Sequence, residues 1–452
     1  MFFMLTIHIG LIKLVNILLR VAILMIYYLK EILMNRLFKK IREDDFNINL
    51  INYLLMFYVF SMMISSKIHG TILYIILIIF FLNENIKNHL ILSFKNKFVQ
   101  ACLLYLLVIL VWMIGSEDLS YAIVQLKINK FYLLPLLFFA IIKIEFFDKF
   151  IYIFLFGLLI NIFWTFLMFF NIIENNFDNL LIMQVDQSFL IFIVVTYAIY
   201  KILSDDNTIK TKFILFILVL LCSFNIFLLK KTAVVSYLII ICILMLYIYR
   251  KNIIKLISTF FIFSCLFILA LNYLMPDIKE QLLHEANGVK KAFIENDYTN
   301  SMSARLGVAK FALETIKDKI IFGYGTGDHS FAVINKIEQS DIKILDYNSY
   351  DTIIGTLITG KHVTLHNTFL QVLVQYGILG FIVFLMIFYR LLQYVILAKK
   401  NIYSAIILTM IVNAFLQFSS GWDFQFGNYG QMYIFTAILL IKLILYKNKI
   451  YT

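Results

Sequence analysis

The sequence predicts an all-α polytopic membrane protein with about twelve transmembrane helices and one large loop on the outer side. Two observations predict this fold. First, 62% of the 452 residues are hydrophobic and only 15% are charged, whereas soluble domains carry about a quarter charged residues. Second, only two prolines, Pro135 and Pro276, occur in the chain, so nearly every apolar run can remain helical. Lipid must therefore be the solvent for most of the surface.

Apolar runs long enough to cross a bilayer recur along the chain. They lie near residues 48–66, 68–83, 98–115, 131–145, 150–170, 179–200, 212–229, 232–249, 254–274, 367–391, 401–418 and 429–447. These runs divide the chain into an N-terminal segment, nine spans, an outer loop, and three further spans with a tail. The corresponding ranges are 1–47, 48–274, 275–365 and 366–452.

The positive charges set the orientation of the spans. Lysine and arginine gather in alternate loops, at 36–43, 84–97, 143–149, 201–211, 250–255, 390–400 and in the tail. The intervening loops 171–179 and 419–428 contain acids but neither lysine nor arginine. By the positive-inside rule, the basic loops and both termini are cytoplasmic. The net charge of +12 therefore reflects topology, and we expect no nucleic-acid partner.

The N-terminal segment 4–34 is apolar and open to more than one interpretation. Thr6, Lys13, Arg20 and Tyr27 recur every seven residues. This stripe favours a basic amphipathic helix on the anionic cytoplasmic leaflet. An additional span, or an upstream extension before a start at Met34, is the alternative.

The hydrophilic segment 275–365 is predicted to be a folded outer loop. Within it, residues 303–320 have helical periodicity, with Ser303 as the expected N-cap. The expected apolar face comprises Leu306, Ala309, Leu313, Ile316 and Ile320. After that helix comes the sequence GYGTGD at 323–328, which we interpret as a tight glycine turn. The alternative is that its backbone N–H groups cradle an oxyanion.

Two polar pairs lie at predicted outer ends of spans. Lys230-Lys231 falls between the spans 212–229 and 232–249, against the general charge pattern. Either the pair anchors the helices by snorkelling, or it holds an anion. His366-Asn367 opens the tenth span, where the helix dipole favours a neutral imidazole suited to general-base chemistry. The alternative is an interfacial histidine that bonds its own helix end.

These features together resemble the O-antigen ligase and O-antigen polymerase superfamily over roughly residues 48–447. One matching motif runs from Ala304-Arg305 to Gly323-Tyr324-Gly325, and a second joins Leu365-His366-Asn367 to Gly377-Ile378-Leu379-Gly380. The family also has a basic residue heading the eighth span, usually arginine. Here Lys231, or Lys230, stands in its place. Lysine keeps the charge but lacks the bidentate fork of arginine.

The resemblance implies a type-C glycosyltransferase-like fold in the bacterial inner membrane, with a periplasmic active site. The implied donor is a glycan on undecaprenyl pyrophosphate, and the implied acceptor is a sugar hydroxyl of lipid A-core. His366 would act as the base and Arg305 would stabilise the leaving pyrophosphate, with Lys231, Lys230 and Asn367 binding substrate. Single displacement would invert the anomeric centre, and we expect neither a metal nor another cofactor.

Other functions fit parts of the same pattern. An O-antigen polymerase uses the same donor, and an O-linked protein oligosaccharyltransferase would pass it to a Ser or Thr hydroxyl. A lipid-linked oligosaccharide flippase is the rival from another class. It would show internal repeats and midplane charges, whereas these candidate charges lie at the predicted outer edge.

Overall fold

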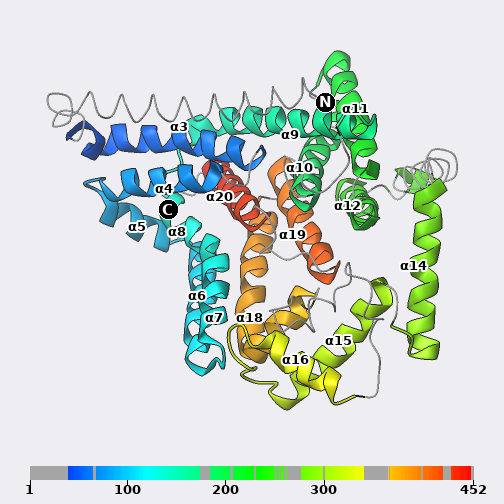
Figure 1. Ribbon diagram of the computed structural model, residues 1–452. Coiled ribbons are helices and arrows are strands. Elements are labelled where there is room, and N and C mark those ends of the chain that lie inside the picture. Colours follow the sequence, from blue (N-terminus) through cyan, green and yellow to red (C-terminus); the bar gives the residue numbers. More distant parts are fainter. Residues whose placement is uncertain are drawn as a thin grey trace.

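The computed structural model describes residues 39–64, 68–173, 184–203, 207–228, 231–249, 252, 254–255, 257–258, 261, 276–298, 301–340, 365, 367–398, 401–420 and 429–448. The described part is helical throughout (Figure 1). The N-terminal segment 4–34 and most of the predicted span 254–274 lie outside it. The predicted surface helix therefore stays a prediction.

The described helices include six that are long and apolar enough to cross a membrane, or seven if the bent pair α4 and α5 forms one span. Two shorter apolar helices cover Ala233–Tyr249 and Ile402–Phe418. The helices of the bundle are α3 (Asp44–Met62), α4 (Ile68–Phe81), α5 (Ile86–Phe94), α6 (Lys97–Trp112), α9 (Phe147–Phe169), α10 (Gln184–Leu203), α11 (Ile209–Leu228), α12 (Lys231–Tyr249), α18 (Thr368–Leu397), α19 (Ile402–Ser420) and α20 (Tyr429–Lys447). The six candidate spans are α6, α9, α10, α11, α18 and α20. These findings support an all-α membrane protein, whereas the total of twelve spans stays a prediction.

The last helix, α20, lies at the centre of the bundle (Figure 1). Of its span, 83% is buried inside the protein, compared with 17% for α11, whose residues mostly face outward. Helices α8, α10, α18 and α19 all pack against α20. A helix that is apolar on every side belongs in such an interior position.

The predicted span 131–145 is not one helix. Helical structure instead runs through α7 (Leu119–Ile128), the 3-10 turn η2 (Asn129–Leu133) and α8 (Leu134–Phe138), followed by the 3-10 turn η3 (Ile144–Phe146). Pro135 lies in the first turn of α8, where its missing N–H costs least. The proline therefore explains why a tighter turn separates α7 from α8.

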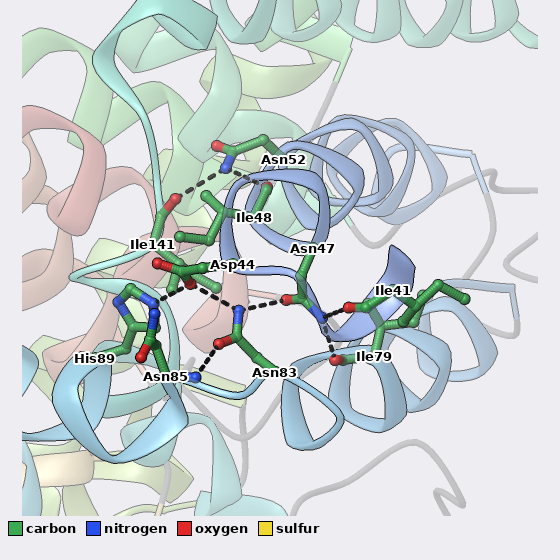
Figure 2. A network of polar contacts seen from close by, with 10 residues as sticks. All are labelled: Ile41, Asp44, Asn47, Ile48, Asn52, Ile79, Asn83, Asn85, His89 and Ile141. Atoms are coloured by element: carbon green, nitrogen blue, oxygen red, sulfur yellow. Dashed lines mark hydrogen bonds and ion pairs between the residues drawn. The ribbon is translucent and has the colours of Figure 1, made fainter. Parts of the chain in front are cut away.

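The predicted cytoplasmic loop 84–97 is also largely helical. Residues 86–94 form α5, which is bent by 110° from α4. A polar network holds this bend to the start of α3 (Figure 2). Asp44 accepts hydrogen bonds from His89 Nε2 at 2.6 Å and from Asn83 Nδ2 at 2.9 Å.

Asn47 and Asn52 extend the network along α3. Asn47 Nδ2 donates to the Ile79 carbonyl at 2.7 Å, and Asn52 Nδ2 donates to the Ile141 carbonyl at 2.8 Å (Figure 2). Burial of the Asp44 carboxyl opposes its ionisation, but the hydrogen bonds, that from His89 foremost, lower the pKa of Asp44 below its usual value.

Candidate functional site at the outer domain

The segment predicted to be the large outer loop contains three described helices with a hydrophobic core of their own. They are α14 (Pro276–Glu295), α15 (Ser301–Asp318) and α16 (His329–Glu338). The core comprises Ala292, Tyr298, Ala304, Val308, Phe311, Ala312, Ile316, Ala332, Val333, Leu365 and Val374. We call this unit the outer domain. In Figure 1, α15 and α16 lie below the bundle beside α18, and α14 stands at the right of the bundle.

Helix α15 confirms the predicted helix at 303–320, but two details of that prediction were wrong. The helix begins at Ser301, so the buried Ser303 lies in its first turn and is not the N-cap. Leu313 and Ile320 are more than half exposed, at 52% and 55%. The buried face runs through Ala304, Val308, Phe311, Ala312 and Ile316, of which Ile316 alone was predicted to be on it.

Arg305 lies on α15 and is half-buried. Its neighbour Ala304 belongs to the same buried cluster as Leu365, the residue before His366. Helix α15 also packs directly against α18. The fold therefore brings the arginine motif and the beginning of α18 into one unit, although about 60 residues separate them in the sequence.

Helix α18 begins at Thr368, with Asn367 as its N-cap. The Asn367 side-chain oxygen accepts a hydrogen bond from the Leu370 amide at 3.1 Å, which satisfies one of the unpaired donors of the first turn. His366 lies outside the described residues. Since Asn367 is the cap, His366 precedes the helix in sequence and is not part of its first turn.

The glycine turn at 323–328 is confirmed. Gly323, Gly325 and Gly327 have φ values of 69°, 127° and 91°, in the region that favours glycine. The alternative oxyanion cradle disagrees with the hydrogen bonds, because each backbone N–H of this turn already has an acceptor in the protein. The acceptors are the Lys319, Val374, Gln375, Trp112 and Gly325 carbonyls and the Gln375 side-chain oxygen.

The glycine turn interlocks with a break in α18 at Gly377, which has φ 59° and ψ −165°. The Tyr324 amide donates to the Val374 carbonyl at 2.9 Å, and the Ile378 amide donates to the Ile320 carbonyl at 2.9 Å. A Cβ added at Gly323 would lie 2.6 Å from the Gly377 nitrogen. We call this contact between residues 320–327 and 374–379 the glycine clasp.

The break also divides α18 into two parts with different surroundings. All 30 residues of α18 would extend about 45 Å, well beyond a hydrocarbon core of about 30 Å. Leu370, Leu373 and Val374 pack in the core of the outer domain. The first part of α18 therefore contacts the outer domain on one side, while Phe369, Val372 and Tyr376 pack in the core of the bundle.

Asp328 joins the outer domain to the loop between η1 (Met113–Gly115) and α7. Its carboxylate accepts hydrogen bonds from the Glu117 amide and the Ser116 hydroxyl, both at 3.0 Å. The Thr326 hydroxyl donates to the Ile109 carbonyl of α6 at 2.7 Å. The outer domain is thus fixed on α6 as well as on α18.

At the surface of the outer domain, Lys336 on α16 pairs with Asp318 at the end of α15, at 2.8 Å. The hydrogen bond from Lys336 lowers the pKa of the Asp318 carboxyl, and Asp318 in turn raises the pKa of Lys336. Both side chains face solvent, so this pair adds little to stability. The pair links the two helices that flank the glycine turn.

Lys231 is the first residue of α12, as expected for a basic residue that heads the eighth span. Its side chain and the whole of Lys230 lie outside the described residues. The helix that Lys231 begins packs against α10, α11 and α19. Whether this pair reaches the same ligand as Arg305 therefore stays a prediction.

The sequence analysis missed a group of buried polar side chains between α9, α10, α11, α19 and α20. Gln187 Nε2 donates to Asn225 Oδ1 at 2.8 Å and to Thr165 Oγ1 at 2.9 Å. Asn413 Nδ2 donates to the Tyr429 hydroxyl at 3.1 Å. The group also includes Asp186, which is 1% exposed.

Such polar residues inside a bundle are costly and often functional. Asn225 lies six residues before Lys231, so the group lies close to the head of α12. An acid and an amide within the apolar run 179–200 were the signal that could have revealed it.

The described residues contain no group of three or more His, Cys, Asp or Glu side chains placed to hold a metal ion. The described part of the candidate site comprises the half-buried Arg305, the capped start of α18 and the contacts that join them. A guanidinium in this setting can bind phosphate oxygens through two parallel hydrogen bonds.

The family model for O-antigen ligase matches residues 216–385, from α11 through the outer domain into α18. No curated protein matches the chain. The matched region includes Lys230-Lys231, Arg305, the glycine clasp and His366-Asn367. It confirms the resemblance based on these motifs, because residues 216–385 are similar to the O-antigen ligase family.

Proposed function

We propose that the protein transfers a glycan from undecaprenyl pyrophosphate to a sugar hydroxyl of lipid A-core. The reaction takes place at the periplasmic face of the bacterial inner membrane. The family match supports the general type of activity, that of an O-antigen ligase or polymerase. The apolar helices support a multi-pass membrane protein. The donor, the acceptor and the side of the membrane belong to the proposal.

The observation that carries the proposal is the attachment of α15 to the start of α18. Arg305 lies on α15 and Asn367 caps α18, two helices that share one buried cluster and are joined by the glycine clasp. A transfer reaction needs a group for the leaving pyrophosphate and a base for the acceptor at fixed separation. A rigid outer domain with both motifs on it meets that need.

The proposed chemistry follows from the charges that develop. As the bond between the sugar and the pyrophosphate breaks, negative charge grows on the departing phosphate oxygens. Arg305 stabilises that charge, and Lys231 adds a second positive charge. His366 takes the proton from the attacking hydroxyl, so the anomeric centre inverts in a single displacement.

Asn367 has a smaller place in this proposal. Because its side-chain oxygen caps α18, only its amide nitrogen remains to donate to a substrate. Its main effect is to fix where the chain enters α18, and thus where His366 stands. Lys230 precedes Lys231 in the sequence, and we propose only an auxiliary contact with substrate for it.

The test uses the purified full-length protein in lipid nanodiscs with a lipid-linked glycan donor. Three acceptors are compared: lipid A-core, a second lipid-linked repeat, and a peptide rich in Ser and Thr. Transfer to lipid A-core supports the ligase, whereas transfer only to the repeat or the peptide indicates a polymerase or a protein oligosaccharyltransferase. Movement of donor across vesicles without transfer would indicate a flippase.

A His366→Ala variant tests the base. We expect transfer to fall by about 10²- to 10⁴-fold, the usual cost of losing a general base, while donor binding persists. Rapid transfer by this variant would exclude His366 from that role.

A further inference from the structure

The bundle contains an apolar groove away from the outer domain. Its lining comes from α9, α10, α19 and α20 and includes Phe147, Phe154, Ile193, Tyr197, Tyr403 and Leu440. Its volume is about 630 Å³, including the part that is open to the outside. The surface that lines the groove is apolar. A groove of this size and lining suits a hydrocarbon chain.

One end of the groove carries positive charge. Tyr403 lies at the start of α19, and Lys447 Nζ lies 4.7 Å from the centre of its ring. Lys201 follows Tyr197 by one turn on α10, which places both on the same face of that helix. Asp148 is also exposed near this end. Lys447 therefore places a positive charge beside Tyr403 at this end of the groove, and Lys201 lies on the same face of α10 as Tyr197.

These ends of α10, α19 and α20 adjoin the basic loops that the positive-inside rule assigns to the cytoplasm. That leaflet is rich in anionic lipids, and each lysine near its surface is worth about 1 kcal/mol of attraction. The phosphates of the donor are expected at the opposite end of the bundle. The positive end therefore matches a lipid other than the donor.

We propose that this groove is a binding site for an anionic phospholipid of the cytoplasmic leaflet. One acyl chain lies in the groove, and the headgroup phosphate contacts Lys447 and Lys201. The bound lipid fills a space between the central helix α20 and the outer helix α9. It would thus stabilise the bundle that supports the outer domain.

The test measures lipid retained by the delipidated full-length protein, using native mass spectrometry. Phosphatidylglycerol and phosphatidylcholine with identical chains are the two probes. We expect preferential retention of phosphatidylglycerol. Lys447→Gln should weaken it about fivefold, which corresponds to about 1 kcal/mol. Lys149→Gln is the matched control, because Lys149 Nζ lies 4.7 Å from the Phe146 ring, on another face of α9.

A second pair of variants tests the groove itself. Ile193→Trp should fill it and reduce retention of both lipids, whereas Ile217→Trp on the exposed face of α11 should not. Thermal unfolding confirms that each variant is folded. Equal retention of the two lipids, or equal effects of the paired variants, would overturn the proposal. A competition with undecaprenyl phosphate gives a further outcome. If undecaprenyl phosphate displaces phosphatidylglycerol and Lys447→Gln does not change this displacement, the groove holds the donor's tail and the proposal is overturned.

Discussion

Replacing Gly377 with alanine should loosen the outer domain from the span that follows it. The glycine has φ 59° and ψ −165°, a combination that essentially only glycine adopts. A Cβ there would lie 2.7 Å from the Phe322 nitrogen and closer still to the Ile321 carbonyl. Backbone atoms cannot rotate away as a side chain would, so residues 320–325 must move.

The free energy lost by the glycine clasp is the sum of two costs. Holding a residue other than glycine in this conformation costs about 1–3 kcal/mol. Losing the hydrogen bonds from Tyr324 to Val374 and from Ile378 to Ile320 costs about 0.5–1.5 kcal/mol each. Together these costs destabilise the closed clasp by about 2–6 kcal/mol. Since 1.4 kcal/mol is a tenfold change in an equilibrium constant, even the lower value reduces the ratio of closed to open clasp about 30-fold.

The assay is glycan transfer by the purified variant, with limited proteolysis of the outer domain as a second measurement. We expect slower transfer and faster cleavage between α15 and α16. Gly70→Ala is the control, since no atom lies within 4 Å of its added Cβ and alanine favours a helix. A Gly377→Ala variant with normal transfer and normal protection would refute the role assigned to the clasp.

Three further changes test the charged groups. Arg305→Lys should lower transfer at least tenfold by raising the donor concentration required, because lysine loses the bidentate contact. A variant that needs no more donor than wild type would show that Arg305 has a structural role only. Lys231→Ala should strongly reduce transfer, and Lys231→Arg should preserve it. Lys230→Ala is the internal control and should have a milder effect. Equal, small losses of transfer in the two alanine variants would indicate that the lysines only anchor the helices. Because the folded pKa of Asp44 is lowered, its bond to His89 should stabilise the protein above about pH 4, the unfolded pKa. That stability is lost as the pH falls through the folded pKa. The melting temperatures of wild type and Asp44→Asn should therefore converge in acid, and a constant difference would contradict this reasoning.

The sequence predicted the helices where periodicity or hydropathy was decisive. The helix at 303–320 appears at 301–318 because its apolar residues repeat at helical spacing. Its buried face was predicted less well, since large residues such as Leu313 were assumed to be inside. Ala304 and Ala312 are buried instead, because α15 packs closely on its neighbours. Such a choice depends on partners that sequence periodicity does not specify.

The contacts that position the candidate site were beyond prediction for a different reason. Ser116 and Asp328 are 212 residues apart, yet their side chains lie 3.0 Å from each other. Ser116 stands in no recognisable motif, and although Asp328 ends the GYGTGD turn, a single sequence gives no pairing between distant loops. The buried group around Gln187 and Asn225 was missed for the same reason.

The two motifs that carried the family resemblance are parts of one physical unit. Gly323 follows the arginine helix and Gly377 interrupts the helix that follows His366-Asn367. Each glycine leaves room for the backbone of the other segment, so neither motif can adopt its observed conformation without the other. The distances along the chain from Gly323 to Arg305 and from Gly377 to Asn367 therefore determine how far the arginine motif lies from the start of α18. Gly323 and Gly377 therefore affect transfer only by positioning α15 and α18, and replacing either should reduce transfer to every acceptor by the same factor.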